Sequence, residues 1–389
     1  MKNSFHPNGG SLERMSLMTG AIASFGVRRD SYSPSVRIAN RLGRCVVSIF
    51  LGVAILGTFL TPRLIAAPAS DQRLRYTGIN IAGAAFGSKV LPGKHGTHYF
   101  YPKAASIDYF ASKGMNIIRV PFRWERLQRR IGADLDEDEL RLLDGVVDYA
   151  TSKNIYVLLD PHNYATYFGT VLGTPDLPIE RLATFWGLLA DHYKKNPKVF
   201  FGLMNEPKEI AADTWLSAVN ASIAEIRRRG ADNTVFVPGV SWTSARNWLK
   251  SSADVMRQVV DPKENYVYEV HQYFDQDFRG TRPECRDPTS IRATLTGFTN
   301  WAREHHKRGF LGEFAVGPDH NCLDLLDELL KFMEENSDVW VGWTYWAAGP
   351  FAKNYFTNLE PSDGADKPQL SILERHTNGG NLAFDRTRK

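Results

Sequence analysis

The chain has 389 residues, of which 43% are hydrophobic and 12% aromatic, so it can bury a core as large as that of a barrel domain of roughly 250 residues. Its formal net charge of +4 is uneven: residues 1–69 hold eight Lys or Arg and two Asp or Glu, which leaves 39 basic against 41 acidic residues in the remainder. This nearly neutral remainder argues against a nucleic-acid-binding protein, which needs a basic face to displace counterions.

Residues 1–69 have the features of an export signal. Five arginines between residues 28 and 44 precede an apolar run at 46–60, and Ala67-Pro68-Ala69 provides the small residues that a cleavage site requires. We therefore expect a leader at 1–69, a folded domain at 70–389 and secretion into the extracellular space.

The leader is unusually long, because 45 residues come before its apolar run, whereas a whole signal peptide usually has about 15–30. Two alternatives therefore stay open. Translation could begin later, at Met15 or Met18, or residues 45–62 could remain as a membrane anchor of marginal length. A membrane is a partner of the chain only in the second case.

From about Leu74 onward, strand and helix patterns alternate, with no linker and no repeat of obvious period. We expect strands in the apolar or alternating runs at 76–84, 116–122, 156–163, 200–204, 234–242, 266–273, 308–314 and 339–346. Helices are expected between them, at 103–113, 136–153, 179–195, 213–229, 289–307 and 323–335. The acidic run at 134–140 is interpreted as the solvated start of one of these helices.

Eight strands with intervening helices predict an α/β fold, a (β/α)8 TIM barrel that forms a single domain. A doubly wound sheet is the alternative, but no G-x-G-x-x-G motif follows an early strand.

Two of the expected strands, the fourth and the seventh, end in a glutamate. The apolar run at 200–204 changes abruptly to polar residues at Asn205 and Glu206, and Glu313 follows a short apolar run in a similar way. In a parallel barrel the strand ends that carry reacting groups meet at one face, so the two carboxylates can face each other across a cleft. Such a pair suits cleavage of a glycosidic bond, with retention at a separation of about 5–5.5 Å and inversion at about 6.5–9.5 Å.

Six short motifs at the expected strand ends carry a resemblance to a known family. They are RVPF at 119–122, DPHN at 160–163, NEP at 205–207, VHQYFD at 270–275, GEF at 312–314 and WTYWAAG at 343–349. In this order they resemble the retaining glycoside hydrolases of family 5, over essentially all of residues 74–350. The segments GINIAGAAFG and AASIDYFASKGMNIIRVPFRWERLQ resemble, more narrowly, the secreted endo-β-1,4-glucanases of that family.

The resemblance implies a role for each residue at the centre of the site. Glu206 would be the general acid/base and Glu313 the nucleophile of a two-step hydrolysis, with Asn205 bound to the 2-hydroxyl of the sugar. Arg119 would keep Glu313 ionised through an adjacent permanent cation. Tyr273 could donate its phenol to Glu313.

Histidines and tryptophans near the same strand ends are further candidates. His162 and His271 could donate hydrogen bonds to substrate hydroxyls or hold the two acids. Trp346 suits a flat platform for a pyranose ring, and Trp242 and Trp248 could extend that platform along a chain substrate. Packing inside the barrel is the alternative for all three tryptophans.

Cysteine usage points to one disulfide. Of the three cysteines, Cys45 belongs to the leader, which leaves Cys285 and Cys322 as an even pair in a chain that we expect to be exported. Two separate buried thiols are the alternative. No C-x-x-C or H-E-x-x-H spacing is present, so we expect neither a metal site nor a cofactor.

The sequence therefore predicts a secreted, monomeric endo-β-1,4-glucanase whose partner is a β-glucan polysaccharide. Two alternatives remain. Another β-glycanase of the same fold, a mannanase, xylanase or β-1,3-glucanase, would use similar chemistry, and a non-catalytic carbohydrate-binding protein would use the fold without it.

Overall fold

The computed structural model describes residues 73–350 and 355–377. The predicted leader at 1–69, with its possible anchor at 45–62, lies outside the described residues. Within the described part of the chain, no helix combines the length and the apolar composition that a membrane crossing requires.

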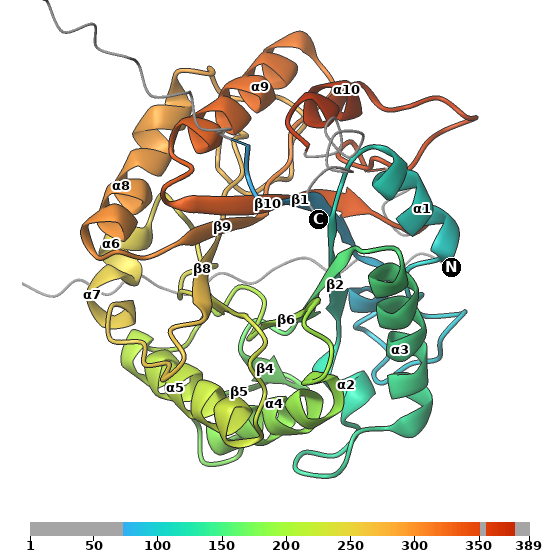
Figure 1. Cartoon of the computed structure of the whole chain (residues 1–389), viewed down its shortest axis with the longest axis vertical. Coiled ribbons are helices and arrows are strands. Elements are labelled where there is room, and N and C mark those ends of the chain that lie inside the picture. Colours follow the sequence, from blue (N-terminus) through green and yellow to red (C-terminus); the bar gives the residue numbers. More distant parts are fainter. Residues whose placement is uncertain (1–72, 351–354, 378–389) are drawn as a thin grey trace, which may run out of the picture. The chain divides into compact units, whose positions relative to one another are not determined.

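Eight parallel strands close into a barrel in the order β1, β2, β3, β6, β7, β8, β9, β10, and β10 pairs with β1 (Figure 1). Their bounds are β1 Tyr76–Ile81, β2 Ile117–Phe122, β3 Tyr156–Pro161, β6 Val199–Gly202, β7 Val235–Pro238, β8 Tyr266–His271, β9 Gly309–Glu313 and β10 Trp340–Ala348. Each of them overlaps one of the eight expected strands, so the predicted (β/α)8 barrel is confirmed.

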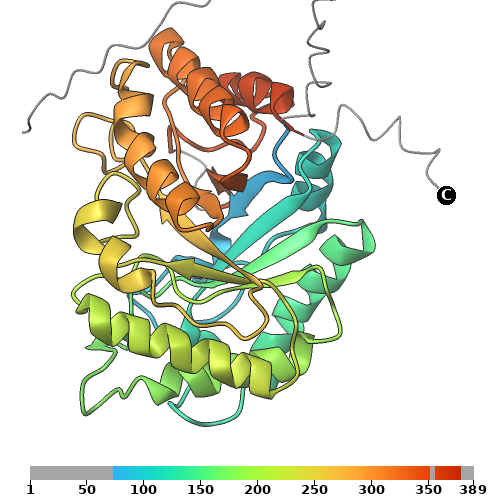
Figure 2. The same ribbon diagram turned by 60° about the vertical axis from the view of Figure 1, so that its left-hand side comes forward.

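Helices surround the strands, as Figures 1 and 2 show from two directions. The longer ones are α1 Ala104–Ser112, α3 Glu137–Ser152, α4 Glu180–Tyr193, α5 Ala212–Arg228, α8 Ser290–Glu304, α9 His320–Glu335 and α10 Pro368–Arg375. Short elements that the sequence did not predict are η1 Gly83–Ala85, α2 Trp124–Leu127, α6 Trp248–Ser251, α7 Ala253–Met256 and the hairpin of β4 Thr166–Tyr167 and β5 Thr170–Val171. Most of these short elements lie in the loops that follow β1, β2, β3 and β7, at the face where the strands end.

One layer of the barrel interior is apolar and takes one residue from each strand. Its members are Tyr76, Ile117, Leu158, Phe200, Phe236, Val267, Phe310 and Val341. Side chains alternate along a strand, so the residues two positions further on also point inward. In β2, β3 and β8 these are Arg119, Asp160 and Glu269, and all three are buried. The interior thus changes from apolar to charged toward the ends of the strands.

The acidic run at 134–140 contains one residue that the prediction placed wrongly. Asp136 caps α3 by accepting a hydrogen bond from the Glu139 amide at 3.0 Å. Glu139 itself is buried, and its carboxylate accepts hydrogen bonds from the hydroxyls of Tyr99 and Tyr101. The interpretation of this run as solvated is therefore wrong at Glu139, because the loop before α1 folds over the start of α3.

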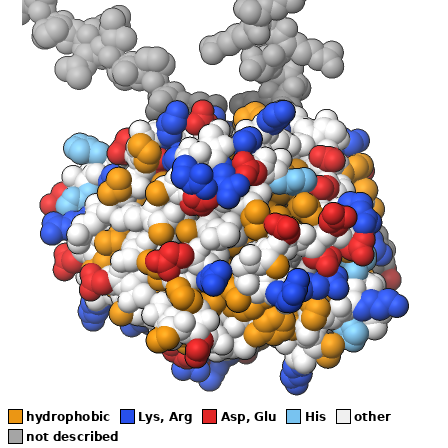
Figure 3. Space-filling model, turned by 90° about the horizontal axis from the view of Figure 1, so that it is seen from below, with side chains coloured by type: hydrophobic (Ala, Val, Ile, Leu, Met, Phe, Trp, Pro, Cys, Tyr) orange, Lys and Arg blue, Asp and Glu red, His pale blue; other side chains and the backbone are white. Residues whose placement is uncertain are grey.

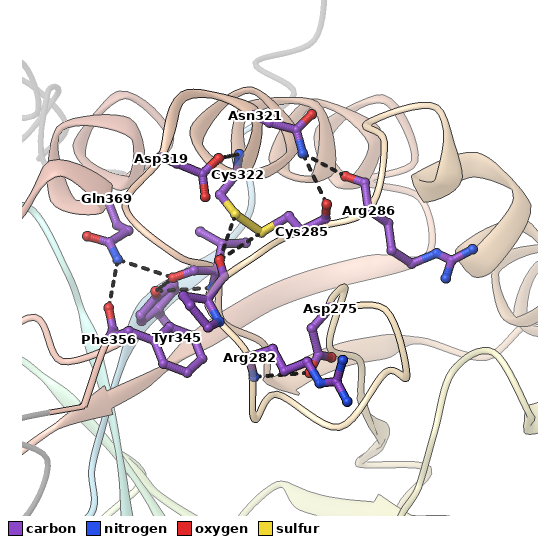
Figure 4. The surroundings of a disulfide bond; sticks show 12 residues. Asp275, Arg282, Cys285, Arg286, Asp319, Asn321, Cys322, Tyr345, Phe356 and Gln369 are labelled. Carbon is purple, nitrogen blue, oxygen red and sulfur yellow. Dashed lines mark hydrogen bonds between the residues drawn. A yellow bond between two sulfur atoms is a disulfide. The ribbon is translucent and has the colours of Figure 1, made fainter.

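Cys285 and Cys322 form the predicted disulfide, which joins the loop between β8 and α8 to the first turn of α9 (Figure 4). Asp319 caps α9 by accepting a hydrogen bond from the Cys322 amide at 3.1 Å. The Asn321 amide side chain donates to the Cys285 carbonyl at 3.2 Å, so polar contacts and the covalent bond fix the same loop.

On the face drawn in Figure 3, Lys and Arg side chains are interspersed with Asp and Glu, and hydrophobic groups lie between them. This mixture agrees with the nearly neutral charge of residues 70–389.

Candidate active site

Glu206 and Glu313 stand at the same end of the barrel. Glu313 is the last residue of β9, beside His271 of β8 in the strand register. Glu206 lies in a turn after β6 and has a φ of 41°, a left-handed conformation that costs a residue with a side chain about 1–3 kcal/mol. Hydrogen bonds hold this turn, including one from the backbone N–H of Asn205 to the Pro161 carbonyl at 3.0 Å. Such local strain is characteristic of functional sites.

The two carboxyl groups are close together. One carboxylate oxygen of Glu206, one carboxylate oxygen of Glu313 and a ring nitrogen of His271 all lie within 4.8 Å of one another. This separation is nearer to the about 5–5.5 Å typical of retaining glycosidases than to the about 6.5–9.5 Å of inverting ones.

A single buried arginine organises the base of the site. The Arg119 guanidinium lies 3.0 Å from Asp160 Oδ2, 2.9 Å from Glu269 Oε1 and 2.9 Å from Glu313 Oε1. It also donates to Asn205 Oδ1 at 2.9 Å. Burial alone would lower the pKa of Arg119, but the carboxylates raise it above its ordinary value, so the charge is permanent.

Glu313 is held on both of its oxygens. Oε1 faces Arg119, and Oε2 accepts a hydrogen bond from the Tyr273 hydroxyl at 2.9 Å. Burial raises the pKa of the Glu313 carboxyl above its ordinary value, while the charges of His271 and Arg119 act in the opposite direction. The ionising effect expected of Arg119 is therefore present, and burial outweighs it.

His271 connects Glu206 to a further buried acid. Its Nδ1 lies 2.8 Å from Glu206 Oε1, and its Nε2 lies 3.2 Å from Glu269 Oε1. Burial lowers the pKa of His271, but Glu313, Glu206 and Glu269 outweigh it and raise the pKa to about 10. A protonated ring donates from both nitrogens, which matches two carboxylate neighbours.

This protonation state also bears on metal binding. The donor atoms of Glu206, His271 and Glu313 are close enough together to surround an ion. A protonated imidazole has no free lone pair, however, so a metal would first have to displace its proton. The arrangement is better suited to holding a proton.

His162 and Trp346 form a stacked pair on the other side of the site. Their ring centroids are 5.4 Å apart and the planes differ by 15°. His162 Nδ1 contacts Asp160 Oδ2 at 2.8 Å, and burial lowers the pKa of His162 well below its ordinary value, so this ring is neutral. Burial raises the pKa of Asp160 to about 7.

The side-chain amide of Asn205 has one atom that is hydrogen-bonded and one that has no partner among the described residues. Its Oδ1 accepts from Arg119, whereas its Nδ2 is buried and has no hydrogen-bond partner among the described residues. An unpaired buried donor costs about 1–3 kcal/mol, so a ligand oxygen at this position would be bound favourably.

A cleft of about 760 Å³ opens above the two glutamates. Its lining residues are His162, Tyr164, Glu206, Ser241, Trp242, Ser244, Arg246, Asn247, Tyr273, Asp277, Phe278, Arg279, Gly280, Glu313, Trp346 and Tyr355. Of the residues predicted for the site, Arg119, Asn205 and His271 lie beneath this cleft, in contact with the glutamates or with each other.

Two neighbouring tryptophans of the predicted platform lie in different surroundings. The Trp242 side chain is 53% exposed and lines the cleft. Trp248 is fully buried, with its ring packed edge-on against Tyr268, Phe298 and Trp301. The prediction that Trp248 extends a sugar platform is therefore wrong, because this residue starts α6 and its side chain packs between the barrel and α8.

Sequence reasoning missed three buried residues that support the site. Asp160 and Glu269 contact Arg119, and Asn80 accepts a hydrogen bond from Arg119 at 3.0 Å. The sequence feature that could have indicated them is a polar residue within a largely apolar strand. Gly312 has a related role, since a Cβ there would lie 2.1 Å from Glu269 Oε1, so only glycine leaves room for that carboxylate.

Comparisons with known proteins agree with this geometry. The sequence model described as Cellulase (glycosyl hydrolase family 5) matches residues 79–349. Endo-beta-1,4-glucanase A of Emericella nidulans is 38% identical over 311 residues, which cover 79% of this chain and 94% of that protein.

Solved structures show the same similarity in three dimensions. XacCel5A in complex with cellopentaose has a TM-score of 0.77 and 43% identity, and the match covers 78% of this chain and 99% of that chain. Pseudomonas stutzeri endoglucanase Cel5A in complex with cellobiose has a TM-score of 0.73 and 35% identity over 78% of this chain and 92% of that chain. The chain therefore belongs to the cellulase family, glycosyl hydrolase family 5.

Proposed function

We propose that this chain is a retaining endo-β-1,4-glucanase that hydrolyses cellulose or a related β-glucan by double displacement. The single observation that carries the proposal is the approach of the Glu206 and Glu313 carboxylate oxygens to within 4.8 Å, which suits direct attack on the sugar. The names of the relatives, and the cellopentaose bound to XacCel5A, support a β-1,4-glucan as the substrate class.

In the first step, Glu313 attacks the anomeric carbon while Glu206 gives its proton to the departing glycosidic oxygen. The carbon–oxygen bond to the leaving chain breaks as the bond to the Glu313 carboxylate forms. Arg119 and Tyr273 hold the nucleophile in one orientation, because each binds a different oxygen of its carboxylate. The product is a covalent glycosyl-Glu313 ester and a free leaving chain.

In the second step, Glu206 takes a proton from a water molecule, which attacks the same carbon from the opposite side. The ester bond breaks and Glu313 regains its negative charge. Glu206 must therefore release and recover one proton in each cycle, and His271 Nδ1, 2.8 Å from Glu206 Oε1, holds its carboxyl group in position.

The remaining predicted residues have roles in binding. The unpaired Nδ2 of Asn205 supports a hydrogen bond from this residue to the 2-hydroxyl, an interaction that strengthens in the transition state. Trp346, which stacks on His162, offers a flat surface for a sugar ring, and Trp242 offers a second one.

The protein of this proposal is also secreted and monomeric. The basic and apolar pattern of residues 1–69 supports export, and retention of residues 45–62 as an anchor is the alternative. Sequencing of the mature N-terminus distinguishes them: a start near Ser70 supports cleavage, and an intact leader in the membrane fraction contradicts it.

The decisive experiment replaces the nucleophile. Glu313→Gln should lower kcat on carboxymethylcellulose at least about 1,000-fold, because the amide cannot form the ester, while binding of cellopentaose measured by calorimetry is retained. Glu206→Gln should retain the first step with an aryl cellobioside, whose good leaving group needs no proton. Glu264→Gln, an exposed glutamate at the opposite end of the barrel, is the matched control.

Two outcomes would contradict the proposal. Full activity in Glu313→Gln would exclude the assigned nucleophile, and an initial product of inverted anomeric configuration by proton NMR would exclude double displacement. A parallel assay on carboxymethylcellulose, mannan, xylan and β-1,3-glucan distinguishes the proposed substrate from those of other β-glycanases.

A further inference from the structure

The outer part of the cleft, which we define by Arg246, Asp277 and Arg279, contains one cation that forms no ion pair among the described residues, Arg246. Arg246, Arg279 and Asp277 line this part. Arg279 and Asp277 pair with each other, with Nε and Oδ2 3.9 Å apart. The Arg246 guanidinium is exposed and has neither an ion pair nor a hydrogen bond within residues 73–350 and 355–377.

Arg246 is nevertheless held in a defined place. Its guanidinium lies over the ring of Phe278, 4.3 Å from the centroid, and that of Arg286 lies 4.6 Å from the same centroid. Contact with an aromatic face leaves the N–H groups at the edges of the guanidinium free. Such a planar fork is the side-chain group that best matches the two oxygens of a carboxylate.

Hydrogen bonds and a disulfide tie down the loop that carries Phe278. The Asp275 carboxylate accepts hydrogen bonds from the amides of Gly280 and Thr281 at 2.9 and 3.0 Å. Gly280 has a φ of 70°, and a Cβ there would lie 2.4 Å from the Tyr273 ring, so the loop needs glycine to pack against the active site. The disulfide at Cys285 fixes the far end of the same loop.

The backbone at the aromatic residues of this region is strained. Phe278 has a φ of 62° and Trp242 a φ of 58°, although residues with bulky side chains rarely adopt this conformation. Strain of this kind persists where the surrounding structure enforces it for function. Here it presents one exposed indole and one aromatic support for Arg246 to the same cleft.

We propose that the outer part of the cleft is a subsite for an anionic sugar unit, with Arg246 as the residue that binds its carboxylate. The ligand class is a β-glucan that carries uronate or carboxymethyl groups, whose neutral rings stack on Trp242. This inference rests on the proposed β-glucanase function and adds a preference among its substrates. Because a charged group binds Arg246 more strongly than a hydroxyl does, the preference should depend on ionic strength.

Two soluble cellulose ethers of similar chain length test the preference. We compare kcat/KM on carboxymethylcellulose, which is anionic, with kcat/KM on hydroxyethylcellulose, which is neutral. Arg246→Gln should lower the ratio of the two values about three- to tenfold, Arg246→Lys should lower it less, and 0.3 M NaCl should reduce the wild-type ratio. Lys195→Gln removes an exposed cation at the opposite end of the barrel and should leave the ratio unchanged.

A binding measurement separates this inference from the proposed function. In the inactive Glu313→Gln background, affinity electrophoresis in gels that contain either polymer reports binding without hydrolysis. Adding Arg246→Gln should reduce retardation by carboxymethylcellulose more than retardation by hydroxyethylcellulose. Equal ratios in Arg246→Gln and Lys195→Gln, in rate or in retardation, would overturn the anionic subsite even if the wild-type protein hydrolyses both polymers. Absence of hydrolysis with a selective loss of binding would instead contradict only the proposed function.

Discussion

The barrel interior has an apolar layer and, two positions further along the same strands, a layer that contains charged residues. The lower layer takes one apolar residue from each strand, including Phe200 and Phe236, whose rings stack at 5.4 Å. The upper layer contains Arg119, Asp160 and Glu269, which are all buried, and both acids contact the arginine. Apolar burial stabilises the first layer, whereas the second carries the energetic cost of charges removed from water.

The charged layer lies directly beside the candidate catalytic residues, since Arg119 contacts Glu313. Four carboxyl groups, those of Asp160, Glu206, Glu269 and Glu313, surround the cations of Arg119 and His271. Acids therefore outnumber cations here. Burial raises the pKa of Asp160 to about 7 and raises that of Glu313 above its ordinary value, whereas at Glu269 the charges of Arg119 and His271 outweigh burial and lower the pKa. A layer selected for stability alone would not contain this excess.

The largest effect should come from removing the central cation. Arg119→Met leaves buried carboxylates without their partner, and we expect a loss of about 3–5 kcal/mol in the free energy of unfolding and of at least about 1,000-fold in kcat. Arg119→Lys keeps the charge but not the fork that reaches Asp160, Glu269 and Glu313 together, so it should fold and still lose activity.

The matched control for this change is another arginine whose side chain is largely buried. Arg227 pairs with Asp261 at 2.8 Å, away from the strand ends that carry the glutamates. Arg227→Lys should lower the melting temperature without changing kcat of the folded fraction. If Arg119→Lys behaved in the same way, Arg119 would be purely structural.

A change in the apolar layer should lower the stability of the fold and leave kcat nearly unchanged. Phe200→Ala opens a cavity among the rings of Tyr76, Tyr156 and Phe236, and we expect a loss of about 3–4 kcal/mol in the free energy of unfolding by urea denaturation. At a temperature where the variant remains folded, kcat should stay within about twofold of the wild-type value. A large fall in kcat there would mean that the two layers are not separable.

Glu269 should give an intermediate effect that depends on pH. The raised pKa of His271, about 10, means that its proton stabilises the fold fully below the ordinary value of about 6.5 and that this stability is lost as the pH rises toward 10. Glu269→Gln removes one of the carboxylates that raise this pKa, so the loss should be complete at a lower pH.

Nitrogen-15 NMR of His271 measures this directly. The ring should remain doubly protonated at pH 8 in the wild-type protein and titrate below that pH in Glu269→Gln, with kcat reduced about tenfold. We expect a smaller cost than for Arg119, since other carboxylates still face both cations. Identical titrations in the two proteins would show that Glu269 only fills space.

Much of this arrangement was predictable from the sequence, and the exceptions share a cause. Alternation and apolar runs predicted all eight strands, and the abrupt change at Asn205 and the motif around Glu313 indicated the two acids. Glu139 was placed wrongly because its partners, Tyr99 and Tyr101, belong to a loop about 40 residues earlier in the chain. The local sequence pattern indicates which face of a helix or strand is apolar. It does not indicate which distant loop covers a polar side chain.

The local sequence pattern also fails to distinguish the exposed tryptophan from the buried one. Replacing the exposed tryptophan should give the smallest of the predicted effects. Trp242 and Trp248 occupy similar sequence contexts, but only the first is exposed. Trp242→Ala should raise KM for a soluble β-glucan about three- to fivefold, because one stacking surface is lost, while the free energy of unfolding changes by less than about 0.5 kcal/mol. Leu249→Ala removes a comparably exposed apolar side chain, on α6, and should leave both quantities unchanged. An unchanged KM in Trp242→Ala would mean that its strained backbone serves only to shape the loop around Glu206, a role that the hydrogen bond from its amide to the Pro207 carbonyl already allows.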